Sequence, residues 1–302
     1  MPEQSHWKRA SLIVNTASRR GARAFKRVQA ELREAGFAVT PYALTNPDDL
    51  TPLVKKLIDA GEKLLIVGGG DGTISEIVDQ LVYSDVVLGI LPLGTANSFS
   101  RSLDIPTNLS QAIKVIAGGK TAQIDLGKIN GDYFANAASI GYASSIAQDI
   151  PTKLKKRFGI FAYAIQGVRN VRKLKPFLVT LEQGTKKESV QTYQVVIANG
   201  GFYGPASLVS KSRLQSADLS IFTFKNAGPL RMANSWVRSV MGIALSQQGM
   251  QRIEVVNEVT LHTVPTQRVS IDGEIKTETP IRISVAPRAL TILVAGTSKL
   301  HP

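Results

Sequence analysis

LLIVGGGDGTISEIV, residues 64–78, is the stretch of sequence that decides the fold. Its apolar start is typical of a buried strand, and its second half repeats Ile74, Ile77 and Val78 at helical spacing. A glycine-rich turn between a strand and a helix lets backbone N–H groups approach an anion, because glycine has no side chain in the way. The positive end of the helix points at the same place. The stretch therefore predicts a phosphate site at one edge of a sheet.

The first third of the chain alternates strands with single helices. This pattern predicts a parallel sheet wrapped by helices, with ligands at the carboxyl ends of the strands. The fold class that we expect for this part is therefore α/β. The expected strands are residues 12–14, 37–44, 63–67 and 85–91, and the expected helices are residues 21–35, 50–58 and 74–82.

From about Ile124 onward, short β-rich runs follow one another and predict a mostly β second domain. We place the domain boundaries at residues 1–126 and 127–289, with residues from about 290 to 302 packing back on the first domain. Without a low-complexity linker, we expect a tight interface with a cleft. The expected strands are residues 133–140, 177–182, 192–198, 219–224, 253–262, 269–272, 281–285 and 290–294, with helical insertions at residues 152–174 and 230–245.

Composition narrows the classes of function. The chain of 302 residues has no cysteine, which excludes disulfides, thiolate nucleophiles and cysteine-based zinc sites. Its three histidines are far apart, so a histidine metal site is not expected. No apolar stretch approaches the roughly 20 residues of a spanning helix, and the start lacks a signal peptide, so we expect a cytoplasmic protein.

The formal net charge of +13 implies an anionic partner. Nucleic acid, an anionic membrane surface and a phosphorylated small molecule are the three candidates, but no nucleic-acid recognition motif accompanies the charge. Residues 153–175 combine an apolar helical face with many basic residues. This segment either rests on a membrane or packs on the protein core with a wet basic side. Basic side chains also gather near the start, at Arg19, Arg20, Arg23, Lys26 and Arg27.

A second loop, GILPLGTANSFSRSL (residues 89–103), leaves a strand through a Pro-Gly turn. It should lie beside the first loop, where Thr95 and Asn97 suit a nucleotide's ribose, base or phosphates, although a purely structural turn is the alternative. In the first loop, Asp71 is a candidate for holding magnesium, because that ion favours oxygen ligands. Thr73 either caps the helix or binds a phosphate. The same residue stands where the dinucleotide fingerprint requires glycine, so that motif is excluded.

Gly-Gly-Asp-Gly-Thr at residues 69–73 together with Pro-Leu-Gly-Thr-Ala-Asn at 92–97 resembles the diacylglycerol kinase catalytic-domain family, especially its soluble bacterial lipid kinases. The resemblance covers nearly the whole chain. It includes LIVNTASRRG (residues 12–21) and SIDGEI (residues 270–275). It implies an enzyme of phospholipid biosynthesis that transfers the γ-phosphate of ATP, with Mg²⁺, to a lipid hydroxyl, and a diacylglycerol-like acceptor is favoured.

The resemblance also assigns roles to residues. It implies a nucleotide-binding first domain and a second domain for the lipid, with Glu274 as general base, Asp272 as its neighbour and Asp71 as a further catalytic residue. Without the resemblance, Asp272-Gly273-Glu274 would be a plain hairpin turn. The expected nucleotide contacts are Asn15, Thr16, Ala17, Ser18, Arg19, Thr45, Gly69, Gly70, Asp71, Gly72, Thr73, Ile74, Ser75, Glu76, Thr95 and Asn97.

The chain departs from the family pattern at several positions. Ser98 replaces a usual carboxylate, and Arg19 stands where glycine is common. Relatives hold a structural metal with an aspartate in an Asp-Gly-Leu-Leu stretch. The matching residues here are Ser216-Ala217 and the nearest carboxylate is Asp218, so this metal site is either displaced or lost. The metal candidates are therefore Asp71 and Asp218.

Three questions stay open at this point. The enzyme could instead be a kinase of NAD, which shares the Gly-Gly-Asp-Gly-Thr loop, or the protein could bind a nucleotide or lipid without transferring phosphate. The acceptor could be diacylglycerol, a monoacyl or sphingoid lipid, phosphatidylglycerol or an isoprenoid alcohol. The partner that we expect is a lipid at an anionic membrane surface, with no nucleic acid, and a homodimer is one of the open assembly states.

Overall fold

The computed structural model describes residues 9–142, 144, 174–199, 202–203, 206–207, 214–224, 231, 234, 238, 250–255 and 258–300. The helical insertions expected at residues 152–174 and 230–245 lie almost entirely outside them. The chain forms two compact units, Met1–Leu126 with Pro287–Pro302 and Gly127–Ala286. Within the described residues, no helix is long and apolar enough to cross a membrane.

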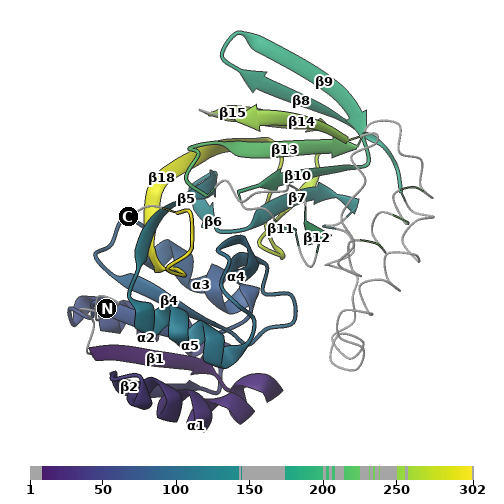
Figure 1. The fold of residues 1–302 in the computed structure, drawn as a ribbon. Coiled ribbons are helices and arrows are strands. Elements are labelled where there is room, and N and C mark those ends of the chain that lie inside the picture. Colours follow the sequence, from purple (N-terminus) through teal and green to yellow (C-terminus); the bar gives the residue numbers. More distant parts are fainter. Residues whose placement is uncertain are drawn as a thin grey trace. The chain divides into compact units, whose positions relative to one another are not determined.

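The first unit is built on a parallel sheet (Figure 1). The strand order is β2-β1-β3-β4, and the end of β18 lies parallel beside β4. Every residue of β3 and β4 is buried, which is why both read as continuous apolar runs in the sequence. The strands are β1 (Arg9–Asn15), β2 (Ala38–Leu44), β3 (Leu64–Gly69), β4 (Val87–Pro92) and β18 (Ile281–Leu293).

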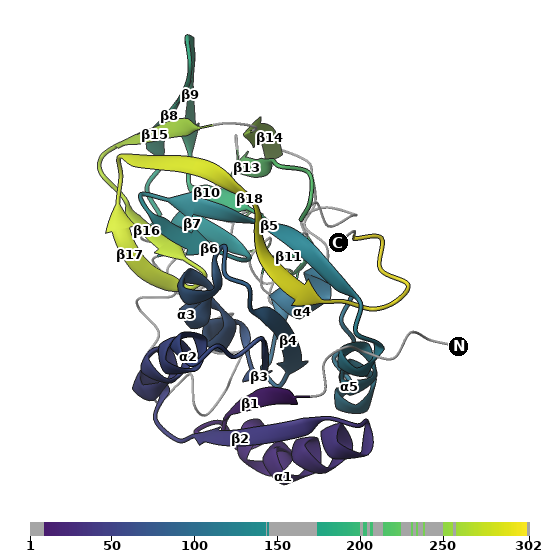
Figure 2. The same ribbon diagram turned by 90° about the vertical axis from the view of Figure 1, so that its left-hand side faces the viewer.

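Helices cover both faces of this sheet. In Figure 2, α2 and α3 lie on one side of β3 and β4, and α5 lies on the other. The helix α5 was not expected from the sequence; Asn108 caps its start and Gly119, at φ 68°, ends it. These layers confirm the predicted α/β class. The helices are α1 (Arg19–Glu34), α2 (Leu50–Asp59) after the short 3₁₀ turn η1 (Pro47–Asp49), α3 (Asp71–Leu81), α4 (Ser98–Ser102) and α5 (Leu109–Gly118).

The second unit is mostly β, as predicted. A six-stranded antiparallel sheet has the order β14-β13-β10-β7-β16-β17. Facing it, β9, β8, β15 and the start of β18 form a second antiparallel layer. The strand β5 (Thr121–Ile129) begins in the first unit and ends in the second. The other strands are β6 (Asp132–Phe134), β7 (Ala137–Gly141), β8 (Phe177–Gln183), β9 (Lys186–Thr192), β10 (Gln194–Ala198), β11 (Phe202–Tyr203), β12 (Ala206–Ser207), β13 (Leu219–Phe224), β14 (Met250–Val255), β15 (Val259–Val264), β16 (Arg268–Ile271) and β17 (Glu274–Glu278).

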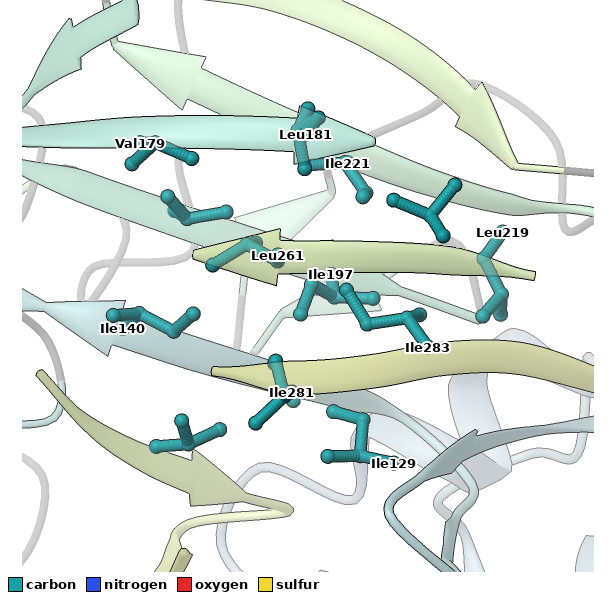
Figure 3. Close-up of a cluster of buried hydrophobic side chains, with 14 of the residues drawn as sticks. Ile129, Ile140, Val179, Leu181, Ile197, Leu219, Ile221, Leu261, Ile281 and Ile283 are labelled. Atoms are coloured by element: carbon teal, nitrogen blue, oxygen red, sulfur yellow. The ribbon is translucent and has the colours of Figure 1, made fainter. Parts of the chain in front are cut away.

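The core of the second unit lies between these two layers (Figure 3). Leu261 and Ile283 from one layer meet Ile197 and Ile221 from the other, and all four are fully buried. Burying an aliphatic side chain of this size contributes about 1.5–3 kcal/mol relative to leaving it exposed. The inward-facing branched residues therefore hold the two sheets together.

Four predicted strands were wrong at their boundaries. The expected strand 133–140 is two strands, because the backbone N–H groups of Ala135 and Asn136 bond to a side chain instead of a neighbouring strand. The expected strand 253–262 is also two strands, β14 and β15. Conversely, the expected strands 281–285 and 290–294 are parts of one strand, β18, which ends at Leu293 and whose interior Pro287 hides its continuity in the sequence.

Candidate active site

The turns that follow β1, β3 and β4 meet at the carboxyl edge of the parallel sheet. Asn15 ends β1, and its Nδ2 donates to the Thr73 hydroxyl of α3 at 3.3 Å. From α1, Arg20 Nη1 donates to the carbonyl of Gly94, the turn residue after β4, at 2.6 Å. The two loops predicted to be neighbours are therefore brought together, and Asn15 joins them.

The start of α3 offers backbone donors. Its N-cap is Gly70, and no side chain caps the helix. The first N–H groups of an α-helix have no acceptor within the helix. A Cβ added at Gly72 would meet nothing within 4 Å, so the space beside this first turn is open. An anion can therefore approach the positive end of the helix, as the sequence predicted.

Gly70 and Gly94 hold the two loops in backbone contact. A Cβ built on Gly94 would lie 2.4 Å from Cα of Gly70, and one built on Gly70 would lie 3.0 Å from Cα of Gly94. The Asn97 amide belongs to the same turn, since its Oδ1 accepts from Gly94 N at 2.8 Å and its Nδ2 donates to Gly94 O at 3.0 Å. Asn97 is buried and its φ is 49°. Its amide therefore shapes the turn.

The turn after β1 is fixed by its own side chains. Ser18 caps α1 by accepting from Gly21 N at 3.0 Å, and its hydroxyl donates to the Asn15 carbonyl at 3.0 Å. Thr16 ties this turn to the end of β2, because its N–H and its hydroxyl both donate to Leu44 O. A Cβ on Gly21 would lie 1.9 Å from Asn15 O, so glycine is required there.

One buried acceptor faces no donor. Asn15 Oδ1 has no hydrogen-bond partner among the described residues. A buried acceptor without a partner costs free energy, so a hydroxyl or amine of a ligand is the group that fits it. Together with the uncapped start of α3, this acceptor makes the edge of the sheet suitable for a molecule that carries both hydroxyls and phosphates.

Asp71 is the first residue of α3, and its Oδ1 accepts from Phe99 N at 3.0 Å. In the described ranges, no three His, Cys, Asp or Glu side chains gather as a metal cluster. The second metal candidate, Asp218, belongs to the other unit, is 5% exposed and accepts from the Ser216 hydroxyl. A magnesium ion at Asp71 would therefore take its remaining ligands from a nucleotide and water, which suits this ion.

The remaining predicted contacts divide by exposure. Ile74 is buried in the core, so only its backbone is available to a ligand. Ser75 is partly buried. The exposed ones are Ala17, Arg19, Thr45, Glu76 and Thr95.

The predicted catalytic pair lies in the second unit, on the two-residue turn between β16 and β17. Asp272 and Gly273 have φ values of 47° and 97°. The Asp272 carboxylate is turned to the protein, where it accepts three backbone N–H groups of residues 135–137. Glu274 presents a side chain that is 73% exposed, with Lys276 Nζ at 3.5 Å from its Oε2. The carboxylate of Asp272 is therefore bonded to the protein backbone, whereas that of Glu274 is open to solvent.

Sequence reasoning missed the contact of Arg20. It placed this residue only within a basic surface cluster, whereas its guanidinium holds the second loop. No local pattern signals a bond between residues 74 positions apart.

Comparisons with known proteins found matches to both units of the chain. The description "Diacylglycerol kinase catalytic domain" matches residues 9–129, and "YegS C-terminal NAD kinase beta sandwich-like domain" matches residues 136–294. A diacylglycerol kinase of Bacillus subtilis is 30% identical over 278 residues, which are 88% of this chain and 90% of the relative. One from Staphylococcus epidermidis is 36% identical over 181 residues, which are 58% and 57% of the two chains. A crystal structure of a candidate diacylglycerol kinase from Bacillus anthracis str. Sterne matches with a TM-score of 0.80 at 23% identity, over 98% of each chain.

Proposed function

Because the chain belongs to the diacylglycerol kinase catalytic-domain family, we propose that it transfers the γ-phosphate of ATP to the hydroxyl of a diacylglycerol-like lipid. The protein is a lipid kinase, a phosphotransferase with an alcohol group as acceptor. The alternative of an NAD kinase is not favoured, since the relatives are named diacylglycerol kinases. Diacylglycerol as the acceptor rests on those names, and a place in phospholipid biosynthesis is part of the same proposal.

The nucleotide binds at the carboxyl edge of the parallel sheet. The observation that carries this assignment is the uncapped start of α3 beside the open space at Gly72. Backbone N–H groups there receive phosphate oxygens, and the helix dipole favours their charge. Asn15 Oδ1 accepts from a hydroxyl of the nucleotide, and the exposed side chains of Arg19, Thr45 and Thr95 add contacts at the rim.

Asp71 would hold Mg²⁺ together with the phosphates of the nucleotide. When bound there, the ion would supply positive charge against the charge on the phosphoryl group that is transferred. The backbone N–H of Phe99 fixes one carboxylate oxygen of Asp71, so its orientation is set before the nucleotide arrives. The proposed role of Asp71 is therefore to hold the ion in place.

Glu274 acts as the general base. Its exposed carboxylate accepts the proton of the lipid hydroxyl while the lipid oxygen bonds to the γ-phosphorus and the bond from phosphorus to the ADP oxygen breaks. Lys276 Nζ lies 3.5 Å from Oε2 of this carboxylate. The second unit thereby supplies the lipid-activating group and the first unit supplies the nucleotide.

The protein works at an anionic membrane surface in the cytoplasm. Its substrate is dissolved in a bilayer, and its net charge of +13 favours an anionic surface. Each basic residue near such a surface contributes about 1 kcal/mol.

Labelled ATP with a total lipid extract tests the function. We expect label in a lipid that co-migrates with phosphatidic acid when diacylglycerol is present, and no label in NAD supplied in parallel. ATP binding without a labelled lipid would leave only a binding protein, and label in NAD alone would reinstate the NAD kinase reading. The mobility of the labelled product identifies the acceptor.

A further inference from the structure

The Asp272-Gly273 turn is the part of the second unit that presents Glu274. It is a two-residue hairpin loop, since Ile271 pairs directly with Glu274 across it. Both turn residues have positive φ, 47° and 97°. Such loops favour Asp-Gly because aspartate tolerates this conformation and glycine adopts it freely. The turn chemistry alone therefore explains the residue types but not the contacts of the carboxylate.

The Asp272 carboxylate accepts three hydrogen bonds from the loop of residues 135–137. Oδ1 accepts from Asn136 N at 3.1 Å and from Ala137 N at 3.0 Å, and Oδ2 accepts from Ala135 N at 3.0 Å. The Asp272 N–H in turn donates to Ala137 O at 3.0 Å. A carboxylate has about four acceptor positions, so three are taken by backbone donors. It is therefore well suited to hold the loop and poorly suited to accept a proton from a substrate.

The loop is held from its other side as well. Asn199, which follows β10 and is 3% exposed, donates from its backbone N to Asn136 O at 2.9 Å. Its Nδ2 donates to Ala135 O at 3.1 Å. The loop N–H groups therefore bind Asp272 and two of its carbonyls bind Asn199. The turn of the β16–β17 hairpin is tied through this loop to the buried strands β7 and β10.

We infer that Asp272 is a positioning residue, whose anchored carboxylate fixes the backbone that carries Glu274. The inference rests on the proposed role of Glu274 and deepens it. The side chain of Glu274 stays 73% exposed while its backbone follows directly on an anchored turn. A base whose backbone is fixed spends more of its time in the reactive geometry, and a misplacement of about 1 Å can cost about 100-fold in rate.

A second turn in the same unit supplies a matched control. Asn130-Gly131 joins β5 to β6 with φ values of 52° and 117°, and Ile129 pairs with Asp132 across it. Its side chain also anchors the backbone, because Asn130 Oδ1 accepts from Arg282 N at 2.9 Å. The anchor is of the same kind, but this turn does not lead into Glu274.

The test compares Asp272→Ala with Asn130→Ala in the full chain, using labelled ATP and diacylglycerol in mixed micelles. Both variants should lose thermal stability. Asp272→Ala alone should lower kcat about 10- to 100-fold, with the KM for ATP nearly unchanged. In a Glu274→Gln background Asp272→Ala should cost no further activity, because the group it positions is gone. If Asp272→Ala does not fold, Asp272→Asn replaces it with a loss of about tenfold, since one amide oxygen retains part of the anchor.

Three results would overturn the inference. One is a kcat of Asp272→Ala within about twofold of the Asn130→Ala value. Another is an equal loss of kcat from Asp272→Ala in the unaltered chain and in the Glu274→Gln background, which would mean that Asp272 acts independently of Glu274. The third is full activity of Glu274→Gln. A failure of the proposed function is distinguishable, because the unaltered protein would then label no lipid.

Discussion

Two glycines of the nucleotide site differ in what an added methyl group would meet. At Gly72 the added Cβ reaches open space beside the first turn of α3. We therefore expect Gly72→Ala to keep or raise stability, since alanine favours a helix over glycine by about 1 kcal/mol. The methyl group would, however, stand where the phosphates bind. Isothermal titration should show ATP affinity reduced by about tenfold or more.

Gly94→Ala is the matched control for this substitution. Its Cβ would lie 2.4 Å from Gly70 Cα, so the two loops must separate. Crowding of this kind costs about 1–3 kcal/mol, and urea unfolding should detect it. Unchanged ATP affinity in Gly72→Ala would contradict a phosphate at the start of α3.

At the residue scale, the sequence predicted residues at the ends of neighbouring strands as parts of one site. Asn15 and Thr73 were both predicted as nucleotide contacts, and their side chains lie within hydrogen-bond distance because β1 and β3 are adjacent and parallel. The anchoring of Asp272 was not reachable, because its acceptor positions are filled by residues about 135 positions away. The triplet Asp-Gly-Glu signals a turn, and nothing in it signals which backbone the aspartate will bind.

At the element scale, α1 begins with a cap that also belongs to the site. Ser18 accepts from Gly21 N and donates to Asn15 O, so it ties the start of the helix to the end of β1. Removing an N-cap side chain costs about 1 kcal/mol. We expect Ser18→Ala to lose about that much stability, measured by urea unfolding, and also to weaken ATP binding several-fold.

Asn108→Ala gives the comparison for an element outside the site. Asn108 caps α5 by accepting from Gln111 N at 3.1 Å. It should lose a similar stability, about 1 kcal/mol, without weakening ATP binding. Equal ATP affinity in both variants would mean that the turn after β1 does not contact the nucleotide.

Element types were easier to predict than element ends. The strands β3 and β4 are buried on both faces and gave unbroken apolar runs. The strand β9, KKESVQT, was missed because it is largely exposed and carries no apolar alternation. Strand β18 was divided in two because Arg288, at φ 49°, and Pro287 interrupt its pattern.

At the scale of the whole molecule, the charge of +13 is the main property. We expect binding to vesicles that contain phosphatidylglycerol and little binding to neutral phosphatidylcholine vesicles. Because salt screens exposed charges, raising the salt concentration from about 0.05 M to about 0.5 M should release most of the protein from the anionic vesicles. Co-sedimentation measures both effects. Equal binding to neutral and anionic vesicles would show that the net positive charge does not drive membrane binding.

The classes of both units were predictable because each carries its own periodicity. The first unit alternates strand and helix, and the second repeats short β runs that bury one face in a shared core. The division into two units at Pro287 has no mark in the sequence, since the single strand β18 continues through that point.

The central claim is that this chain phosphorylates a lipid hydroxyl with Glu274 as the base. The most direct measurement is the rate of label transfer from ATP to diacylglycerol in mixed micelles, for Glu274→Gln beside Glu278→Gln. Glu278 lies on the same strand and is exposed, so it controls for loss of a carboxylate. We predict a loss of about 100- to 10,000-fold for Glu274→Gln and little change for Glu278→Gln. Equal rates in both variants would contradict the account.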